Sequence, residues 1–567
     1  MRKRIHIYLL FALLSCGSLH SQNLEKVGKK DMITVGGAMN LNSIFYDAVG
    51  FTPRRDPFTW YYNGSLNVTI LDVSLPFTYS YSNQHGTYTQ PFNMQSCSPK
   101  YKWVQAHIGT TALTYSPYTL GGHMFTGGAL ELTPNGFFIG GMYGRFRKAV
   151  QDDPVTSAQG EISYKRMGYA FKAGYEHEGN ALTLSYFHAK DEPGSLLFVP
   201  PDADLTPMEN SAIGLSGKTL LWKSLTLNGE FAASGLTRNI YSEIETTEYN
   251  GWEKWLVQTH TTTEFFKAWK FSVGYTLKTF SVSVQHEHVD PGYQTLGAYF
   301  FSNDLENWTV APAFRFLEGK LSVSFNTGFQ KNNLAGDRLS TTQRWVGSAN
   351  VAYNPSKHWM LNGAYSNFTS YTRNRPVADP FWTPSPADTL SFYQVAQQGN
   401  ATVAYNFGEK ITKQSFALIG SYQVTGQQQS GDVLPQTQIL NGNFTWNVQW
   451  IKTKWSITTL ANYNQSEAGT LFTQQFGPGI QLGKSFMQNR LRFSGGGVYN
   501  RSMANSVLLN HVISYRSQLS FTPKVHNPKH GRPSLSANAV YVTKLPVVEG
   551  LEATGELTVT VNVGYSF

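Results

Sequence analysis

The sequence predicts a single closed antiparallel transmembrane β-barrel of about 24 strands, with 26 strands as the alternative and no N-terminal plug domain. Only 14% of the 567 residues are charged, against roughly 25% in ordinary soluble domains, while 14% are aromatic. The mean hydropathy is −0.30, and no internal run of about 18 apolar residues could cross a bilayer as a helix. Segments of alternating polar and apolar residues recur instead, as in strands between lipid and a lumen.

The first residues predict export from the cytoplasm. Arg2, Lys3 and Arg4 precede an apolar stretch over residues 5–14, so residues 1–21 are interpreted as a signal peptide. The sequence before Cys16 also resembles a lipoprotein cleavage box, an alternative that would place a lipid anchor on this residue. With residues 1–21 removed as the signal peptide, residues 22–32 would form a short periplasmic segment, and the barrel would occupy residues 33–567.

The last strand shows the alternation most clearly. From Leu557 to Phe567, Leu, Val, Tyr and Phe occupy the odd positions, while Thr, Asn, Gly and Ser occupy the even ones. Chain ends of this kind resemble the C-terminal signal of bacterial outer-membrane barrels, a terminal Phe with Tyr two residues earlier. That resemblance implies that the barrel-assembly machinery recognises Tyr565 and Phe567.

The same period of two recurs at 269–277, 308–316 and 321–330. Pro312 falls inside the second of these segments, where it predicts a bulge or weakened pairing because proline has no N–H to donate. A soluble sandwich would also alternate. However, some two dozen such segments, often flanked by Trp or Tyr, favour a membrane barrel with aromatic girdles.

The connections between these segments alternate in length. Short turns such as Leu71-Asp72 and Pro134-Asn135-Gly136 carry turn-forming residues. Twelve long connections predict about 24 strands with both termini periplasmic. The long connections are expected near 47–56, 85–100, 150–158, 191–208, 239–263, 291–303, 332–342, 372–388, 428–435, 466–470, 500–505 and 544–553.

One stretch does not fit this count. Tyr101 to Gly122 could hold an extra strand, which would break the even strand number unless another strand is missing. We therefore expect the segment from Ser116 to Gly122 to fold partly into the lumen or to make an irregular corner. A total of 26 strands is the second choice.

A barrel of this size needs something inside it, because even 22-stranded barrels are normally plugged. About ten residues between Gln22 and the first strand are too few to fold as a plug domain. Inserted loops or a partner protein remain as ways to fill the lumen. The candidate gates are 85–100, 191–208, 239–263 and 372–388.

Several segments resemble a family of large outer-membrane barrels of Bacteroidota. The resemblance implies the location and the fold, and it implies no settled activity. The segments that carry it are Arg54-Arg55-Asp56-Pro57-Phe58, residues 79–84, residues 115–123, Met142-Tyr143-Gly144-Arg145, Val289-Asp290-Pro291-Gly292-Tyr293, residues 297–301 and residues 303–307.

Alternation also assigns charged residues to the lumen, since a charge on the lipid face near the midplane costs roughly 2–4 kcal/mol. Inward acids are expected at Glu176, Glu287 and Glu556. The cations could form a basic pore wall that selects anions. Alternatively, they could satisfy one another, inserted loops or external lipid phosphates. The expected pore-lining cations are Arg166, Lys172, Lys270, Arg315, Arg344, Arg490, Arg492 and Arg516.

The sequence favours a loop-gated, porin-like channel for small polar or anionic solutes in the outer membrane of a Gram-negative bacterium. The alternative is a sealed scaffold or accessory barrel of an outer-membrane envelope, secretion or assembly complex. No residue spacing singles out a catalytic set, a cofactor site or a nucleic-acid site, and His286 and His288 are interpreted as girdle residues rather than as a metal pair. The expected partners are outer-membrane lipids, lipopolysaccharide, the assembly machinery and, in the alternative, other envelope proteins.

Overall fold

The computed structural model of the chain describes residues 33–83, 93–151, 162–200, 203–245, 251–299, 302–336, 343–373, 391–408, 411–429, 432–525, 531–547 and 552–567. The predicted signal peptide, Cys16 and most of the candidate gate 372–388 lie outside them. Nearly all described residues belong to one antiparallel sheet, in which strands that follow one another in the sequence pair, except for two short pieces that share the same two neighbours. Short 3₁₀ turns accompany it at η2 (Pro193–Ser195), η4 (Trp252–Trp255), η5 (Leu317–Gly319) and η6 (Met487–Asn489).

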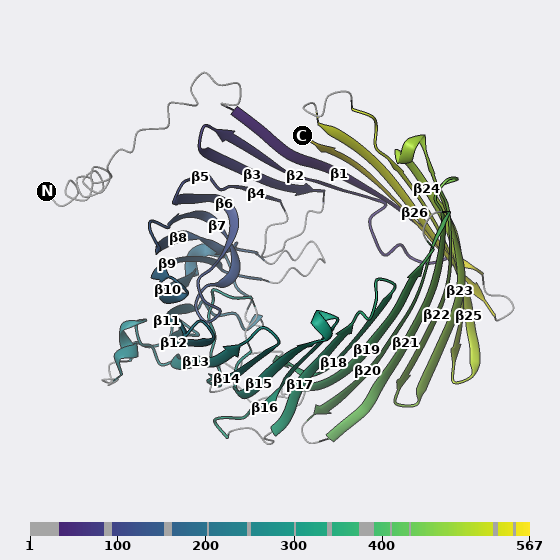
Figure 1. Cartoon of the computed structure of the whole chain (residues 1–567). Helices are drawn as coiled ribbons and strands as arrows, with labels where there is room; N and C mark the ends of the chain where they lie inside the picture. The colour runs from purple at the N-terminus through teal and green to yellow at the C-terminus, as the bar shows by residue number, and fades with distance from the viewer. Residues whose placement is uncertain are drawn as a thin grey trace.

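The strands follow one another along the chain and around the ring (Figure 1). They are β1 (Ile33–Val49), β2 (Phe58–Ile70), β3 (Val73–Ser82), β4 (Met94–Cys97), β5 (Lys100–Tyr101), β6 (Val104–Thr114), β7 (Gly121–Leu132), β8 (Phe137–Arg147), β9 (Lys165–His177), β10 (Asn180–Glu192), β11 (Glu209–Leu221), β12 (Leu225–Thr237), β13 (Thr263–Thr276), β14 (Phe280–Val289), β15 (Leu305–Phe316), β16 (Leu321–Lys331), β17 (Gln343–Tyr353), β18 (Trp359–Arg373), β19 (Ser391–Phe407), β20 (Thr412–Gln429), β21 (Asp432–Trp450), β22 (Trp455–Ala468), β23 (Leu471–Phe486), β24 (Leu491–Ala504), β25 (Val507–Phe521), β26 (Arg532–Pro546) and β27 (Thr554–Ser566).

The barrel has 26 strands, because β4 and β5 are two pieces of one strand. Both pieces lie between β3 and β6, and both pair with them. Ser98 and Pro99 separate them, and proline cannot donate to a ladder. The first choice of 24 strands is wrong and the alternative of 26 is confirmed. The difference has two sources: β4 and Lys100 of β5 fall within the connection expected at 85–100, and the stretch from Tyr101 to Gly122 contains a strand, β6.

The first and last strands close the ring. β1 pairs with β27 from Ala38 opposite Ser566 to Val49 opposite Gly555. The terminal Phe567 extends this ladder, since its amide N donates to the Gly37 carbonyl at 3.0 Å and its carbonyl accepts from the Gly37 amide at 2.8 Å. Because the strand number is even, β1 begins and β27 ends at the same end of the barrel.

The two ends of the barrel differ. The end where β1 begins carries tight turns such as Leu71-Asp72 and His177-Glu178-Gly179, and we call it the turn end. The other, which we call the loop end, carries the longer connections, including 193–208 and 238–262. The corner at 115–120 is an additional loop-end connection that the sequence-based count left out.

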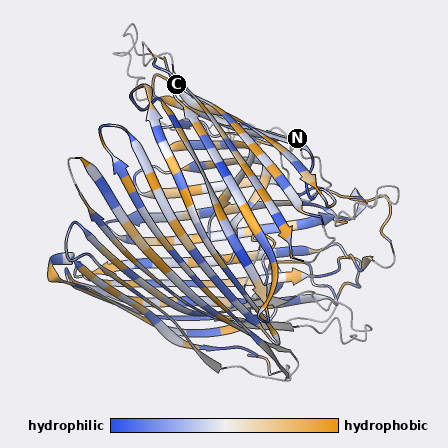
Figure 2. Cartoon of the chain, turned by 90° about the vertical axis from the view of Figure 1, so that its right-hand side faces the viewer, coloured by the Kyte–Doolittle hydropathy of each residue, from blue (hydrophilic) through white to orange (hydrophobic). Residues whose placement is uncertain are grey.

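The outer face of the barrel is apolar. Orange and blue residues alternate along the strands in Figure 2. Outward positions carry exposed apolar side chains such as Phe171, Phe271, Phe444 and Val563, while their neighbours in sequence face the lumen. A closed barrel with such a surface is a transmembrane β-barrel. Among the described residues, no helix is long and apolar enough to cross a membrane.

Two prolines interrupt pairing without shifting the register. Between β15 and β16, the ladder resumes at Ala313 opposite Ser324 after a gap at Pro312. A matching gap lies at Pro478 between β23 and β24. The weakened pairing predicted at Pro312 is therefore present, and no bulge accompanies it.

Candidate functional site: the barrel lumen

The inner face of the barrel has two unlike regions. Along β6–β15, which we call the packed wall, chain segments from the loop end lie inside the ring and cover the strands (Figure 1). Along β18–β27, which we call the single-layer wall, most described inner side chains are half-buried or exposed. Nearly all fully buried side chains among the described residues therefore belong to the packed wall and its covering segments.

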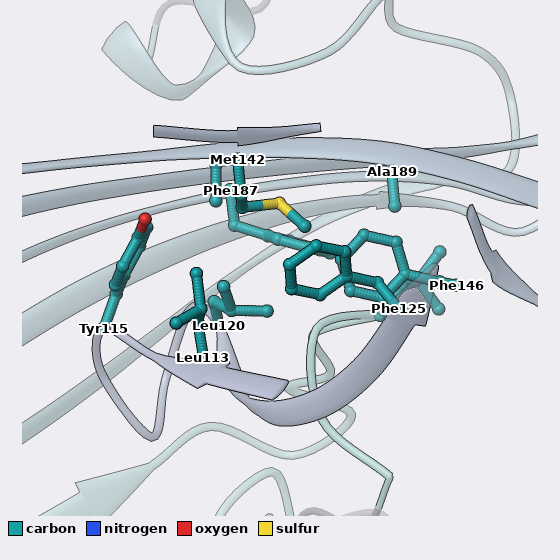
Figure 3. Packing of buried hydrophobic residues seen from close by; sticks show 10 residues of the cluster. Leu113, Tyr115, Leu120, Phe125, Met142, Phe146, Phe187 and Ala189 are labelled. Atoms are coloured by element: carbon teal, nitrogen blue, oxygen red, sulfur yellow. The ribbon is translucent and has the colours of Figure 1, made fainter. Parts of the chain in front are cut away.

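The corner at 115–120 folds into the lumen, as the sequence predicted. Its apolar side chains Tyr115 and Leu120, together with Leu113 at the end of β6, are buried against Met142 of β8 and Phe187 of β10 (Figure 3). A register shift in β6 between Ala112 and Thr114 precedes the corner. Such bulges bend a strand and redirect its side chains, so the chain turns inward here.

A charged row on the strands receives this corner. Glu230, Lys270 and Glu287 lie opposite one another on the inner faces of β12, β13 and β14. The Lys270 Nζ is 3.7 Å from a Glu287 carboxylate oxygen. The Ser116 hydroxyl donates to Glu230, and the Tyr118 hydroxyl donates to Glu287 Oε1 at 2.7 Å. The corner thus supplies hydrogen-bond donors to a row in which two acids flank one cation.

A second segment, 290–299, packs on the corner. The Tyr293 hydroxyl donates to the Tyr118 carbonyl at 2.7 Å, and the Thr295 hydroxyl donates to the Thr119 carbonyl at 2.6 Å. Gly297 accepts from the Gly121 amide at 2.9 Å. A Cβ at Gly297 would lie 2.5 Å from the Thr119 carbonyl oxygen, so this close approach requires glycine.

Asn210 of β11 fixes the second segment to the wall. The side chain has no exposed surface. Its amide nitrogen donates to Ser234 Oγ at 2.8 Å, and its amide oxygen accepts from the Leu296 backbone amide at 3.1 Å. A buried amide with its partners in place specifies one docking position, because any shift would leave it unsatisfied.

Asp191 forms a buried ionic cluster on the same wall. Arg166 binds it through two bonds, Nε to Oδ1 at 2.7 Å and a terminal nitrogen to Oδ2 at 2.9 Å. Arg147 contacts Oδ2 at 3.3 Å. A register shift between Arg145 and Arg147 turns Arg147 toward the lumen. The sequence-based connection 191–208 includes Asp191, so the sequence analysis does not identify it as an inward residue. The alternation of small and apolar inward residues along β10 extends to position 191 and is the signal that could have identified it.

The predicted pore-lining cations therefore divide into two groups. On the packed wall, Arg166 and Lys270 pair with acids, and Lys172 lies over the rings of Tyr115 and Phe138 at 5.9 and 4.6 Å. This arrangement matches the alternative in which the cations are satisfied inside the barrel. The second group is exposed and inward-facing: Arg315 lies at the turn end of β15, the last strand of the packed wall, and Arg492 and Arg516 lie on β24 and β25 of the single-layer wall. None of the three makes an ion pair with another described residue.

The last two predicted cations differ from the rest. Arg490 lies in the turn before β24, where it contacts Gln488 at 3.3 Å, and it is therefore outside the strand wall. Arg344 lies in β17, where its backbone pairs with Gln330.

Amides and hydroxyls dominate the inner face of the single-layer wall. Asn400, Asn443 and Gln518 are exposed at inward positions of β19, β21 and β25. Cross-strand bonds join others, such as Asn447 Nδ2 to Thr458 Oγ1 at 2.7 Å. The wall therefore offers accessible donors and acceptors with few formal charges.

The two histidines that the sequence analysis weighed as a metal pair face away from the lumen. His286 and His288 point outward, where their rings lie 4.2 Å from Trp308 and 4.0 Å from Trp269, while Glu287 between them points inward. This is the geometry of aromatic girdle residues. No group of three His, Cys, Asp or Glu suited to a metal occurs in the described ranges.

Of the candidate gates, two are well described. In 239–263, Val257 packs against Gly235 on the outer side of the wall, and η4 lies beside β12 (Figure 1), so this part does not enter the lumen. In 191–208, Gln151 binds the Phe198 carbonyl at 2.6 Å, which holds the loop to the β8–β9 connection. Among the described residues, the segments that fill the lumen are 115–120 and 290–299.

Two tyrosines of the filling segments are shielded from water. Burial raises the pKa of Tyr118 above its ordinary value, and the nearby Glu287 carboxylate raises it further. Burial also raises the pKa of Tyr293. Both hydroxyls therefore remain protonated donors at neutral pH.

Among proteins of solved structure, large barrels resemble this chain only distantly. No family model and no curated protein sequence matches the chain. The structure is similar to the P pilus usher (PapC) translocation pore, with 12% identity and a TM-score of 0.37 over 93% of this chain and 99% of that one. It is also similar to OccAB2 of Acinetobacter baumannii, with 8% identity and a TM-score of 0.32 over 94% of this chain and 98% of that one. A third similar structure is BauA, the ferric preacinetobactin receptor of the same organism, with 8% identity and a TM-score of 0.38 over 94% of this chain and 80% of that one. Similarities this distant carry no argument about activity.

Proposed function

We propose that the chain is an outer-membrane channel of a Gram-negative bacterium, through which small polar or anionic solutes pass along the single-layer wall. The packed wall narrows the lumen from one side. The proposal includes export by the N-terminal signal, assembly through Tyr565 and Phe567, and a surface in contact with lipids and lipopolysaccharide. It assigns no catalytic activity and no cofactor.

One observation carries this proposal. The filling segments 115–120 and 290–299 are fixed to the packed wall, while the inner face opposite carries accessible amides, hydroxyls and a few cations. A sealed barrel would be expected to bury both inner faces. A polar, wetted wall along long strands supports a continuous aqueous path instead.

The exposed cations support a preference for anions. Arg315, Arg492 and Arg516 lie on the accessible part of the lumen, whereas Arg166 and Lys270 are neutralised. Unpaired lumen cations raise the local concentration of anions. We infer a modest preference, since most of the accessible wall is uncharged.

Planar bilayers test the proposal directly. The purified, folded barrel should give steady single-channel currents, and the reversal potential in a salt gradient should indicate anion preference. Replacing Arg492 and Arg516 with Gln should shift this potential toward that of a non-selective pore. Absence of current from barrel that is folded, as shown by heat-modifiable migration, would contradict the channel.

A second function has an observation of its own. Large apolar side chains are exposed at the loop end, including Leu197, Phe198 and Trp255, which are 99%, 61% and 86% exposed. Exposed apolar surface outside a lipid band is typical of protein interfaces. A scaffold or accessory barrel would bind an envelope partner there, and crosslinking in cells from Trp255 would identify that partner.

A further inference from the structure

A small cavity lies at the loop end of the single-layer wall, beside the closing seam. Its volume is about 160 Å³, and it is lined by Phe51 and Arg54 of the β1–β2 connection together with Val542, Lys544 and Glu556 of β26 and β27. Val542 lies opposite Glu556 and Lys544 lies opposite Thr554 on the inner faces of these strands. The cavity is therefore on the lumen side, where solutes would enter from the loop end.

The charged side chains of this cavity form no ion pairs, and two of them, Arg54 and Glu556, are held in position by neighbouring rings. The Arg54 guanidinium lies 5.2 Å from the Phe51 ring centroid, an arrangement that restricts its movement. The Tyr46 hydroxyl, itself buried, donates to Glu556 Oε2 at 3.2 Å. Arg54, Lys544 and Glu556 form no ion pair with one another or with other described residues.

We propose that this cavity, which we call the seam site, binds a monoanionic hydroxy-carboxylate of the size of one sugar acid. Two cations against one carboxylate favour a ligand with a single negative charge. Glu556 can only accept hydrogen bonds, so the ligand must offer donors such as hydroxyl groups. Phe51 and Val542 supply apolar surface for the C–H face of a sugar ring. The cavity volume of about 160 Å³, below the several hundred Å³ of typical ligand pockets, suits a ligand no larger than one sugar ring.

The same chemistry disfavours inorganic phosphate. Near neutral pH phosphate carries more than one negative charge and presents mainly acceptors. Glu556 would repel it and could not donate to it. The seam site should therefore prefer a sugar acid over phosphate and over a neutral sugar, which lacks the carboxylate that the cations bind.

The inference rests on the proposed channel, because the site is reached through its lumen. Binding can nevertheless be measured without transport. Titration calorimetry of the full-length folded barrel in detergent should show that glucuronate binds and that glucose does not. Arg54→Gln and Lys544→Gln should each lower the affinity for glucuronate by roughly tenfold or more, since each removes a charge-assisted hydrogen bond. Lys218→Gln, which removes an exposed inward lysine of β11 on the packed wall, should have no effect.

A further variant separates the hydroxy-carboxylate from a simple anion. Glu556→Gln should weaken glucuronate binding and strengthen phosphate binding. Heat-modifiable migration verifies the folding of every variant. Tighter binding of phosphate than of glucuronate to the unmodified barrel would overturn the proposal, as would unchanged glucuronate affinity in folded Arg54→Gln and Lys544→Gln. Glucuronate binding without any conductance would contradict the proposed channel but not the seam site. Conductance without glucuronate binding would contradict the seam site but not the channel.

Discussion

On the packed wall, the inner face of β12 carries Ala232 and Leu236 with no exposed surface, whereas on the single-layer wall the inner face of β21 carries Asn443, which is exposed. Both strands alternate, both pair on each side, and both face lipid with apolar residues. The difference lies in what their inner faces contact. Small and apolar inner residues receive a second layer of chain, while amides and hydroxyls remain in contact with water. Inner-face composition therefore distinguishes a wall that fills the barrel from a wall that lines a path.

The largest expected effect is at the ionic cluster of the packed wall. Asp191→Asn would leave Arg166 and Arg147 without their carboxylate, and loss of one partner of a buried pair costs about 3–5 kcal/mol. Arg516→Gln on the single-layer wall should cost less than about 0.5 kcal/mol. Urea unfolding of the barrel in thin-bilayer vesicles, followed by tryptophan fluorescence, measures both. Equal costs would remove the energetic distinction between the walls.

Apolar truncation should show the same asymmetry. Leu120 is fully buried between the corner and the strands, so Leu120→Ala should lower the free energy of unfolding by about 2–5 kcal/mol. Leu460, an inward leucine of β22, is only half-buried, and Leu460→Ala should cost clearly less. The same unfolding assay serves for this pair, and a larger loss at Leu460 would contradict the assignment of the second layer.

Close approach of the two filling segments predicts a smaller cost. Gly297→Ala would place a methyl group 2.5 Å from the Thr119 carbonyl oxygen and force the segments apart, at a cost of about 1–3 kcal/mol. At Gly399 in β19, no atom lies within 4 Å of the position that an added methyl group would take, and Gly399→Ala should change stability by less than about 0.5 kcal/mol. Thermal midpoints measured by heat-modifiable migration separate the two, and no loss at Gly297 would show that the segments are not tightly docked.

Alkaline pH should weaken the docking of the filling segments. The folded pKa values of Tyr118 and Tyr293 lie above the ordinary value of 10.0, so the unfolded chain loses these protons first. The contribution of the two protonated hydroxyls to the free energy of unfolding is complete below pH 10. Above pH 10 this contribution falls by at most about 1.4 kcal/mol per pH unit for each tyrosine. Tyr118→Phe combined with Tyr293→Phe should flatten the decline in urea stability above pH 10. An unchanged slope would show that neither hydroxyl is shielded.

Local alternation was enough to predict the closed barrel and the faces of its strands. The expectation that residues 116–122 fold partly into the lumen or form an irregular corner came from the strand count instead. It could not identify β4 and β5, because Ser98 and Pro99 divide that strand into pieces too short to show a period. It also could not identify Asp191 as an ionic centre, because the cluster depends on a bulge in β8 that changes which side Arg147 faces. Contacts between distant segments, such as Thr295 with Thr119, leave no periodic signal in the sequence.

Cysteine accessibility tests the central claim that solutes pass along the single-layer wall. In a Cys97→Ser background, a membrane-impermeant cationic thiol reagent should reach Asn443→Cys and lower the single-channel current. Ala232→Cys on the packed wall should not react, and Phe444→Cys, which faces lipid, serves as the control for the same strand. Current loss at Ala232→Cys together with an unreactive Asn443→Cys would contradict the account.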